Sequence, residues 1–264
     1  MYGKKIIYSI FFCLLSVNTF AMQLSNDLQE IVKDGKLTVA FVSPDVNKQT
    51  YAFDKELALK IANELSVTLN PVIANSHDEA VALVASKQAE LAISNITRTP
   101  KRGKYVLFSA PYNNSYLALI ENRNNATVTD VTREKIIKKY NQPNMKIGAL
   151  EGTVFADIAK NYFPKAKLTT YTNENQMLSD IDNNKIDMAV TDNYIGKSLL
   201  KAAPQLSLSL ALTKIHDWIL DDAIVINTEH IHLMYWINLL LDTYEHDGTL
   251  KAMRSQYLNH RVGK

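Results

Sequence analysis

The chain has 264 residues, enough for one large domain or for two lobes of about 100 to 150 residues each. Hydrophobic residues make up 47% and charged residues 21%, while glycine (8) and proline (7) are sparse, which excludes disordered, collagen-like and low-complexity chains. The formal net charge is only +2, so the chain has no strong basic field for nucleic acid or for an anionic membrane. We therefore expect no nucleic-acid partner.

The first 21 residues have the organisation of an export signal. Lys4 and Lys5 form a basic start, residues 6–15 are apolar, and the segment closes on the small residue Ala21. We expect cleavage after Ala21 and a mature protein in the periplasm. The single cysteine, Cys13, lies inside this segment, so we expect no disulfide and no thiolate metal site in the mature chain.

Predicted helices and strands alternate through the first part of the mature chain. An amphipathic segment at residues 24–32 ends at Asp34-Gly35. The next predicted helix begins at Asp54, which is well placed to cap it. The predicted elements are strand 36–42, helix 54–65, strand 67–73, helix 78–86 and strand 91–94.

The alternation restarts after the polar stretch at residues 121–130. The elements predicted there are helix 133–140, strand 146–150, helix 153–162, strand 167–171, helix 174–183, strand 186–191 and helix 193–202. The last part, strand 223–226 with helices 229–245 and 249–258, is too small for a core of its own, so we expect it to pack on the first unit. Such alternation predicts an α/β protein of two units, each a mainly parallel sheet covered by helices.

The sequence contains no nucleotide-binding loop, dinucleotide fingerprint, zinc-ligand spacing or serine-hydrolase elbow. We therefore expect neither a cofactor nor a metal. His230 and His232 are two residues apart, so on a helix they point in different directions and are expected to be structural or solvent-facing.

Several stretches, in matching chain order, resemble family 3 of the bacterial extracellular solute-binding proteins, the periplasmic receptors of polar amino acid ABC transporters. The signature is residues 91–102 (LAISNITRTPKR) followed by residues 106–112 (VLFSAPY). Further matches are residues 35–39 (GKLTV), Phe53-Asp54, residues 146–153 (KIGALEGT), residues 186–192 (IDMAVTD) and residues 247–250 (DGTL). The resemblance extends through nearly all of the mature chain.

The resemblance implies a two-lobed flytrap with two hinge strands that run between the lobes. One crossing is expected near Ala118–Glu121 and the return near Leu208–Thr213. Lobe 1 would then be discontinuous, with residues 22–120 and 212–264, and lobe 2 would be residues 121–211.

A free amino acid carries a carboxylate and an ammonium on one carbon, so its receptor needs a cationic fork, convergent N–H donors and a buried anion. Arg102 offers a planar, permanently charged fork. By resemblance it grips the α-carboxylate; the alternative is a solvated arginine beside Lys101 and Lys104. Thr97 matches the position that contacts the same ligand head, and Asn95 matches a position whose backbone carbonyl takes the ammonium.

Two further stretches supply donors and an anion. Gly152-Thr153 precedes a predicted helix, whose free N–H groups suit a carboxylate, although an ordinary strand-to-helix turn has the same sequence. Asp192 matches the carboxylate that pairs with the ammonium. It is also a normal helix N-cap, and both roles are compatible.

Departures from the family pattern affect specificity. Asp45 and His77 stand where many relatives place aromatic walls, so a more polar or smaller ligand side chain is expected, with Tyr51 or Phe53 as substitute walls. Leu150 replaces a ligand-facing lysine of some relatives, which argues against an acidic ligand. Arg98 is an unusual charge inside the signature.

The sequence thus predicts a non-enzymatic periplasmic receptor that captures a polar amino acid and delivers it to an ABC permease at the inner membrane. An alternative is a periplasmic enzyme on the same scaffold, similar to cyclohexadienyl dehydratase, with Glu151 or Asp192 as its acid. A third is a receptor for a sensor kinase or an orphan scavenger with another small ligand.

Overall fold

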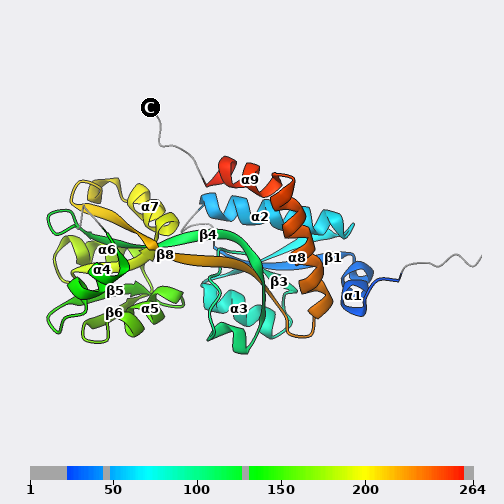
Figure 1. The fold of residues 1–264 in the computed structure, drawn as a ribbon, viewed down its shortest axis with the longest axis horizontal. Helices are drawn as coiled ribbons and strands as arrows, with labels where there is room; N and C mark the ends of the chain where they lie inside the picture. Colours follow the sequence, from blue (N-terminus) through cyan, green and yellow to red (C-terminus); the bar gives the residue numbers. More distant parts are fainter. Residues whose placement is uncertain (1–22, 44–47, 127–130, 259–264) are drawn as a thin grey trace, which may run out of the picture.

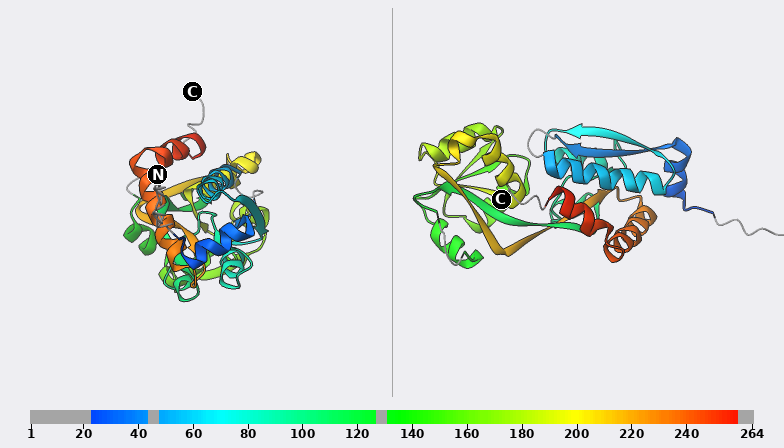
Figure 2. Two further views of the ribbon diagram at one scale, coloured as in Figure 1. Left: turned by 90° about the vertical axis from the view of Figure 1, so that its right-hand side faces the viewer. Right: turned by 90° about the horizontal axis from the view of Figure 1, so that it is seen from above.

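The computed structural model describes residues 23–43, 48–126 and 131–258. Two α/β lobes lie side by side along the long axis of the molecule, and two long strands run between them (Figures 1 and 2). The predicted two-lobed α/β architecture is confirmed. The proposed signal segment and Asp45 lie outside the described residues.

The first lobe combines the early part of the chain with its last two helices (Figure 1). Gly35 ends α1 in the left-handed conformation, and the Ser76 hydroxyl caps α3 by accepting from the N–H of Glu79. The elements are α1 (Asn26–Asp34), β1 (Lys36–Val42), α2 (Lys48–Glu64), β2 (Thr68–Ala74), α3 (His77–Ala85), β3 (Leu91–Ala92), the 3-10 turn η1 (Arg102–Lys104), α8 (Ile231–His246) and α9 (Thr249–Tyr257).

The second lobe is continuous in sequence apart from the long strands. Thr132, Asn173 and Asp192 each accept a backbone N–H at the start of a helix. The elements are α4 (Arg133–Tyr140), β5 (Lys146–Leu150), α5 (Val154–Tyr162), β6 (Lys167–Tyr171), α6 (Glu174–Asp182), β7 (Met188–Asp192), α7 (Asn193–Ala202) and the 3-10 turn η2 (Pro204–Leu206).

The strands β4 (Leu107–Asn122) and β8 (Leu210–Ile226) pair antiparallel along most of their length and join the lobes into one sheet, in the order β2-β1-β3-β8-β4-β7-β5-β6. Within each lobe the other strands are parallel, β1 with β2 and β3, and β5 with β6 and β7. The carboxyl ends of these parallel strands therefore face the space between the lobes, where α/β sheets bind ligands.

The two lobes have separate hydrophobic cores, and the long strands contribute to both. Tyr112 of β4 and Ile224 of β8 are buried in the first core, whereas Leu117 of β4 and Leu220 of β8 are buried in the second. The first core also takes in Leu233, Ile237, Leu241, Tyr244, Leu250 and Met253 of the two C-terminal helices. The strands pass from one core to the other between these pairs of residues.

The crossing lies nearer to the first lobe than the sequence analysis expected. Ala118–Glu121 pair with β7 and with β8 inside the second lobe, and Leu119 and Ile120 are fully buried there. The reason is that β4 and β8 stay paired beyond the first core and carry apolar side chains into the second.

The predicted role of Asp54 as a helix cap is wrong. Helix α2 begins at Lys48, six residues earlier, so Asp54 lies in its second turn and is buried. Its carboxylate accepts a hydrogen bond from the hydroxyl of Tyr112 at 2.7 Å instead of capping the helix. Within the described part of the chain, no helix is both long and apolar enough to cross a bilayer.

Candidate functional site

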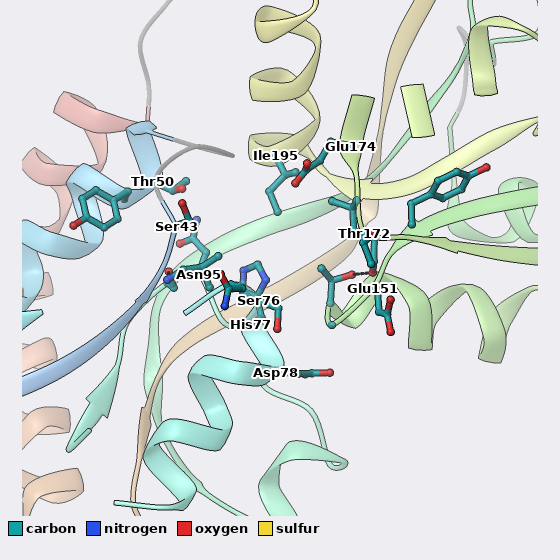
Figure 3. A pocket seen from close by; sticks show the side chains of 18 residues that line it. Ser43, Thr50, Ser76, His77, Asp78, Asn95, Glu151, Thr172, Glu174 and Ile195 are labelled. Atoms are coloured by element: carbon teal, nitrogen blue, oxygen red, sulfur yellow. Dashed lines mark hydrogen bonds between the residues drawn. The ribbon is translucent and has the colours of Figure 1, made fainter. Parts of the chain in front are cut away.

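A cavity of about 590 Å³ lies between the two lobes (Figure 3). The first lobe lines it with the ends of β1 and β2, the starts of α2 and α3, and Asn95 after β3. The second lobe lines it with the ends of β5 and β6, the loop before α5, and the starts of α6 and α7. Helix starts and the carboxyl ends of parallel strands thus face the cavity from both sides.

The charged side chains that line this cavity are acidic. Asp78 belongs to the first lobe, and Glu151 and Glu174 belong to the second (Figure 3). Among the described residues that line the cavity, none is a lysine or an arginine. Asp78 is paired with Arg102, so Glu151 and Glu174 are the carboxylates that favour a cationic group in the cavity.

A second, much smaller hollow of about 10 Å³ adjoins the cavity, since His77, Asn95, Thr153 and Ile195 line both. Its other lining residues include Arg102, Thr97 and Asp192. This volume is close to that of a single water-sized probe. The residues predicted to hold a zwitterionic ligand head thus meet here, in a tight space.

The guanidinium of Arg102 is buried, with 7% of the residue exposed, and is held on two sides. Its Nε and Nη2 donate to Oδ1 of Asp78 at 3.1 and 2.9 Å, and its Nη1 donates to the carbonyl of Thr97 at 3.1 Å. A guanidinium has five N–H donors, so these contacts leave two of them. The side chain of Asp78 itself is half exposed at the cavity.

Asp192 ends β7 and caps α7. Its Oδ1 accepts from the backbone N–H groups of Tyr194 and Ile195, both at 2.7 Å. Burial raises the pKa of Asp192 to about 6, and these two hydrogen bonds oppose the rise. Asp192 is therefore the N-cap that the sequence predicted, and its carboxylate also lines the smaller hollow.

Asn95 adopts the left-handed backbone conformation, with φ of 47°, which asparagine tolerates better than most residues. Its N–H donates to the hydroxyl of Tyr112 at 2.9 Å, and that hydroxyl donates to Asp54. Burial raises the pKa of Asp54 to about 7, and the hydrogen bond from Tyr112 opposes the rise. A buried chain of three residues thus fixes the backbone of Asn95 at the edge of both hollows.

His77 lies at the start of α3 and lines both hollows. Burial of the ring and, to a smaller extent, the charge of Arg102 lower the pKa of His77 to about 4, and Asp78 opposes part of this shift. The imidazole is therefore neutral near pH 7 and adds no positive charge to the cavity.

The two lobes touch at the edge of the cavity. The N–H of Asp78 donates to the carbonyl of Gly152 at 3.1 Å, and Lys101 pairs with Asp157 at 2.8 Å. Gly152 has a φ of +67°, and a Cβ on it would lie 2.8 Å from the Cβ of Ser76. Glycine is therefore needed here both for its backbone conformation and for the close approach of the lobes.

The structure gathers the predicted site residues that it describes. His77, Asn95, Gly152 and Thr153 line the large cavity, and Thr97, Arg102 and Asp192 line the adjoining hollow. The hydroxyl of Thr153 donates to the carbonyl of Leu150. Of the two candidate walls, Tyr51 lines the cavity, whereas Phe53 is buried in the first core against Tyr112.

Sequence reasoning missed three residues around the site. The sequence predicts Asp78 only as the start of a helix, and nothing in it indicates the pair with Arg102. Tyr112 belongs to the quoted signature, but its contact with Asp54 depends on the fold. Asp222 carried a usable signal, because it directly precedes an apolar run, residues 223–226, that is typical of a buried strand. In the structure Asp222 is completely buried. Among the described residues, no cluster of histidine, cysteine or acidic side chains is arranged to hold a metal ion.

A family model described as bacterial extracellular solute-binding proteins, family 3, matches residues 37–260. Two similar proteins come from Escherichia coli K12. ABC transporter arginine-binding protein 1 is 23% identical over 82% of this chain and 85% of its own length. The L-cystine-binding protein TcyJ is 24% identical over 88% of this chain and 78% of its own length.

The fold is also similar to a solved structure of the amino acid ABC transporter substrate-binding protein AbpA from Streptococcus pneumoniae bound to L-arginine. The TM-score is 0.72 at 23% sequence identity, over 89% of this chain and 100% of the other.

The buried carboxyl of Asp54 makes stability depend on pH. In the unfolded chain Asp54 ionises near pH 4, whereas in the fold its pKa is about 7. The contribution of this carboxyl to the free energy of unfolding is therefore fully present below pH 4 and is lost as the pH rises to 7. Asp54→Asn does not titrate, so the free energy of unfolding of the variant relative to wild type should rise by up to about 4 kcal/mol between pH 4 and pH 8.

Chemical unfolding of both proteins at these two pH values measures this difference. The matched control is Asp34→Asn, since Asp34 is exposed at the end of α1. That control should show no comparable change with pH. A difference between Asp54→Asn and wild type that stays constant from pH 4 to pH 8 would contradict the prediction.

Proposed function

We propose that this chain, which belongs to family 3 of the bacterial extracellular solute-binding proteins, is a periplasmic receptor that captures an amino acid between its two lobes and delivers it to an ABC permease. The observation that carries the proposal is the meeting of Arg102 and Asp192, a buried cation and a buried anion from different lobes, at one hollow between them. Export through the predicted signal at residues 1–21 is part of the proposal.

The ligand head is proposed to bind as a zwitterion. Its carboxylate would take the two remaining N–H donors of Arg102, and its ammonium would pair with Asp192 and the carbonyl of Asn95. The hollow between these residues is small, so the lobes must separate for the ligand to enter. Contacts made from both lobes are complete only when the lobes close, so binding shifts the hinge equilibrium toward closure.

The ligand side chain is proposed to be cationic, as in arginine or lysine. This is supported by the carboxylates of Glu151 and Glu174 at the large cavity and by the absence of a lysine or arginine among its described lining residues. The names of the similar proteins, which include an arginine-binding protein and an arginine-bound structure, agree with this choice. An acidic side chain would meet like charges there.

Calorimetric titration of the mature protein with the twenty amino acids tests the proposal. Arginine or lysine should bind, and glutamate and aspartate should not. No binding of any amino acid at millimolar concentration would overturn the proposal, and conversion of prephenate or arogenate would support the dehydratase alternative.

For ligand affinity, the bidentate geometry of the Arg102 guanidinium should matter more than its charge. Arg102→Lys keeps the charge but loses the bidentate geometry, so the affinity for the bound amino acid should fall by at least about tenfold. The matched control is Arg98→Lys, because Arg98 pairs with Asp221 on the surface. Equal affinities of the two variants by calorimetry would argue against a role of Arg102 in ligand binding.

Closure of the two lobes should depend on the lack of a Cβ atom at Gly152. Gly152→Ala adds a Cβ against Ser76, so the lobes cannot approach fully and ligand affinity should fall by about tenfold or more. Gly35→Ala is a matched control, because Gly35 has the same φ of +67° but open space around its Cβ position. Both variants should lose a similar amount of stability, about 1 kcal/mol, from backbone strain. Only Gly152→Ala should lose affinity, and an equal loss in both would refute the closure argument.

A further inference from the structure

The loop that carries Asn95 and Thr97 is tied to the strand β8 where this strand passes between the lobes. The N–H of Ala223 donates to the carbonyl of Ile96 at 3.0 Å, and Thr97 forms an isolated β-bridge with Asp222. Asp222 follows Leu220 of the second core and precedes Ile224 of the first. This residue therefore lies at the crossing and next to the proposed ligand site.

The carboxyl group of Asp222 is buried among neutral partners. The residue is 0% exposed. Its Oδ1 accepts from the hydroxyl of Thr97 at 3.3 Å, and its Oδ2 accepts from the amide of Asn113, on the other crossing strand, at 3.4 Å. Both hydrogen bonds are long, and the described residues provide no ion pair to this group. Such surroundings stabilise a neutral carboxyl far better than a charged one.

The titratable groups that face Asp222 are two carboxyls and two neutral phenols. Asp192 approaches from the start of α7 and Asp54 from α2, and the hydroxyl groups of Tyr112 and Tyr194 belong to the same surroundings. Burial raises the pKa of Asp222 well above its usual range, and the charge of Asp192 raises it further. The cation Arg102 donates to the carboxylate of Asp78 and to the carbonyl of Thr97, and it forms no ion pair with Asp222.

We propose that Asp222 is a positioning residue of the amine subsite and makes ligand capture proton-linked. In its neutral form Asp222 does not repel the charged carboxylate of Asp192. It keeps its hydrogen bonds with Thr97 and Asn113, which lie on either side of the crossing strand. When the ligand ammonium pairs with Asp192, the negative charge beside Asp222 is compensated, and the O–H bond of Asp222 breaks to release its proton to the solvent. The inference rests on the proposed function, since it needs an ammonium group at Asp192.

The test is the calorimetric binding of L-arginine at pH 7.5 in two buffers with different ionisation enthalpies. Burial raises the pKa of Asp192 only to about 6, so Asp192 is already ionised at this pH. A released proton then comes from Asp222 or from Asp54, whose pKa burial raises to about 7, and the variant described below separates these two sources. The wild type should release at least about 0.3 proton per arginine. By linkage, the logarithm of its association constant should rise by the same number for each pH unit.

Asp222→Asn should still bind arginine but release no proton, and its affinity should not change between pH 7 and pH 8. The matched control is Asp221→Asn, because the neighbouring Asp221 pairs with Arg98 on the surface. That control should release as many protons as the wild type. If Asp222→Asn does not fold, the carboxyl signal of Asp222 in aspartate-labelled wild type should titrate at lower pH with arginine than without it.

The outcomes separate the two proposals. Arginine binding with no dependence on the buffer, or equal proton release by Asp222→Asn and wild type, would overturn the role of Asp222 while the receptor function stands. The absence of binding of any amino acid would overturn both.

Discussion

The buried charge of Arg102 determines how the cleft is built. A guanidinium out of water needs acceptors, and it obtains them from Asp78 of α3 and from the carbonyl of Thr97. These contacts draw the start of α3 and the loop after β3 together at the edge of the first lobe. The same stretch, at Asp78, donates a backbone N–H to Gly152 of the second lobe. The cation, its partners and the contact between the lobes thus form one connected unit.

The two long strands β4 and β8 connect this unit to both lobes. Because β4 and β8 pair with each other across the gap between the cores, a change in their pairing moves one lobe relative to the other. The pairing is irregular at two places on β4, between Phe108 and Asn113 and between Tyr116 and Ala118. The first of these places includes Asn113. Asn113 and Asp222 lie opposite each other there, and Asn113 also contacts the side chain of Asn95 at the site. The site and the hinge therefore share residues.

Much of the fold was predictable because its signals are local. The apolar periodicity around Leu57 and Ile61 and the stop at Asp34-Gly35 depend on neighbours within a few residues. Arg102, Thr97 and Asp192 were found because they belong to stretches that resemble a family. The pairing of β4 with β8 was not predictable in this way, because residues about 100 positions apart in sequence form it. The role of Asp54 was misjudged because an aspartate at a helix start and one buried under a tyrosine look alike in sequence.

The contact between the lobes combines interactions that respond differently to the surroundings. Lys101 and Asp157 are both exposed, so dissolved ions weaken their attraction, and such pairs add little stability even in dilute solution. The packing of Gly152 against Ser76 carries no net charge and is insensitive to salt. Salt therefore weakens only the charged part of this contact. The packed part, which sets how closely the two lobes approach each other at Gly152, stays the same.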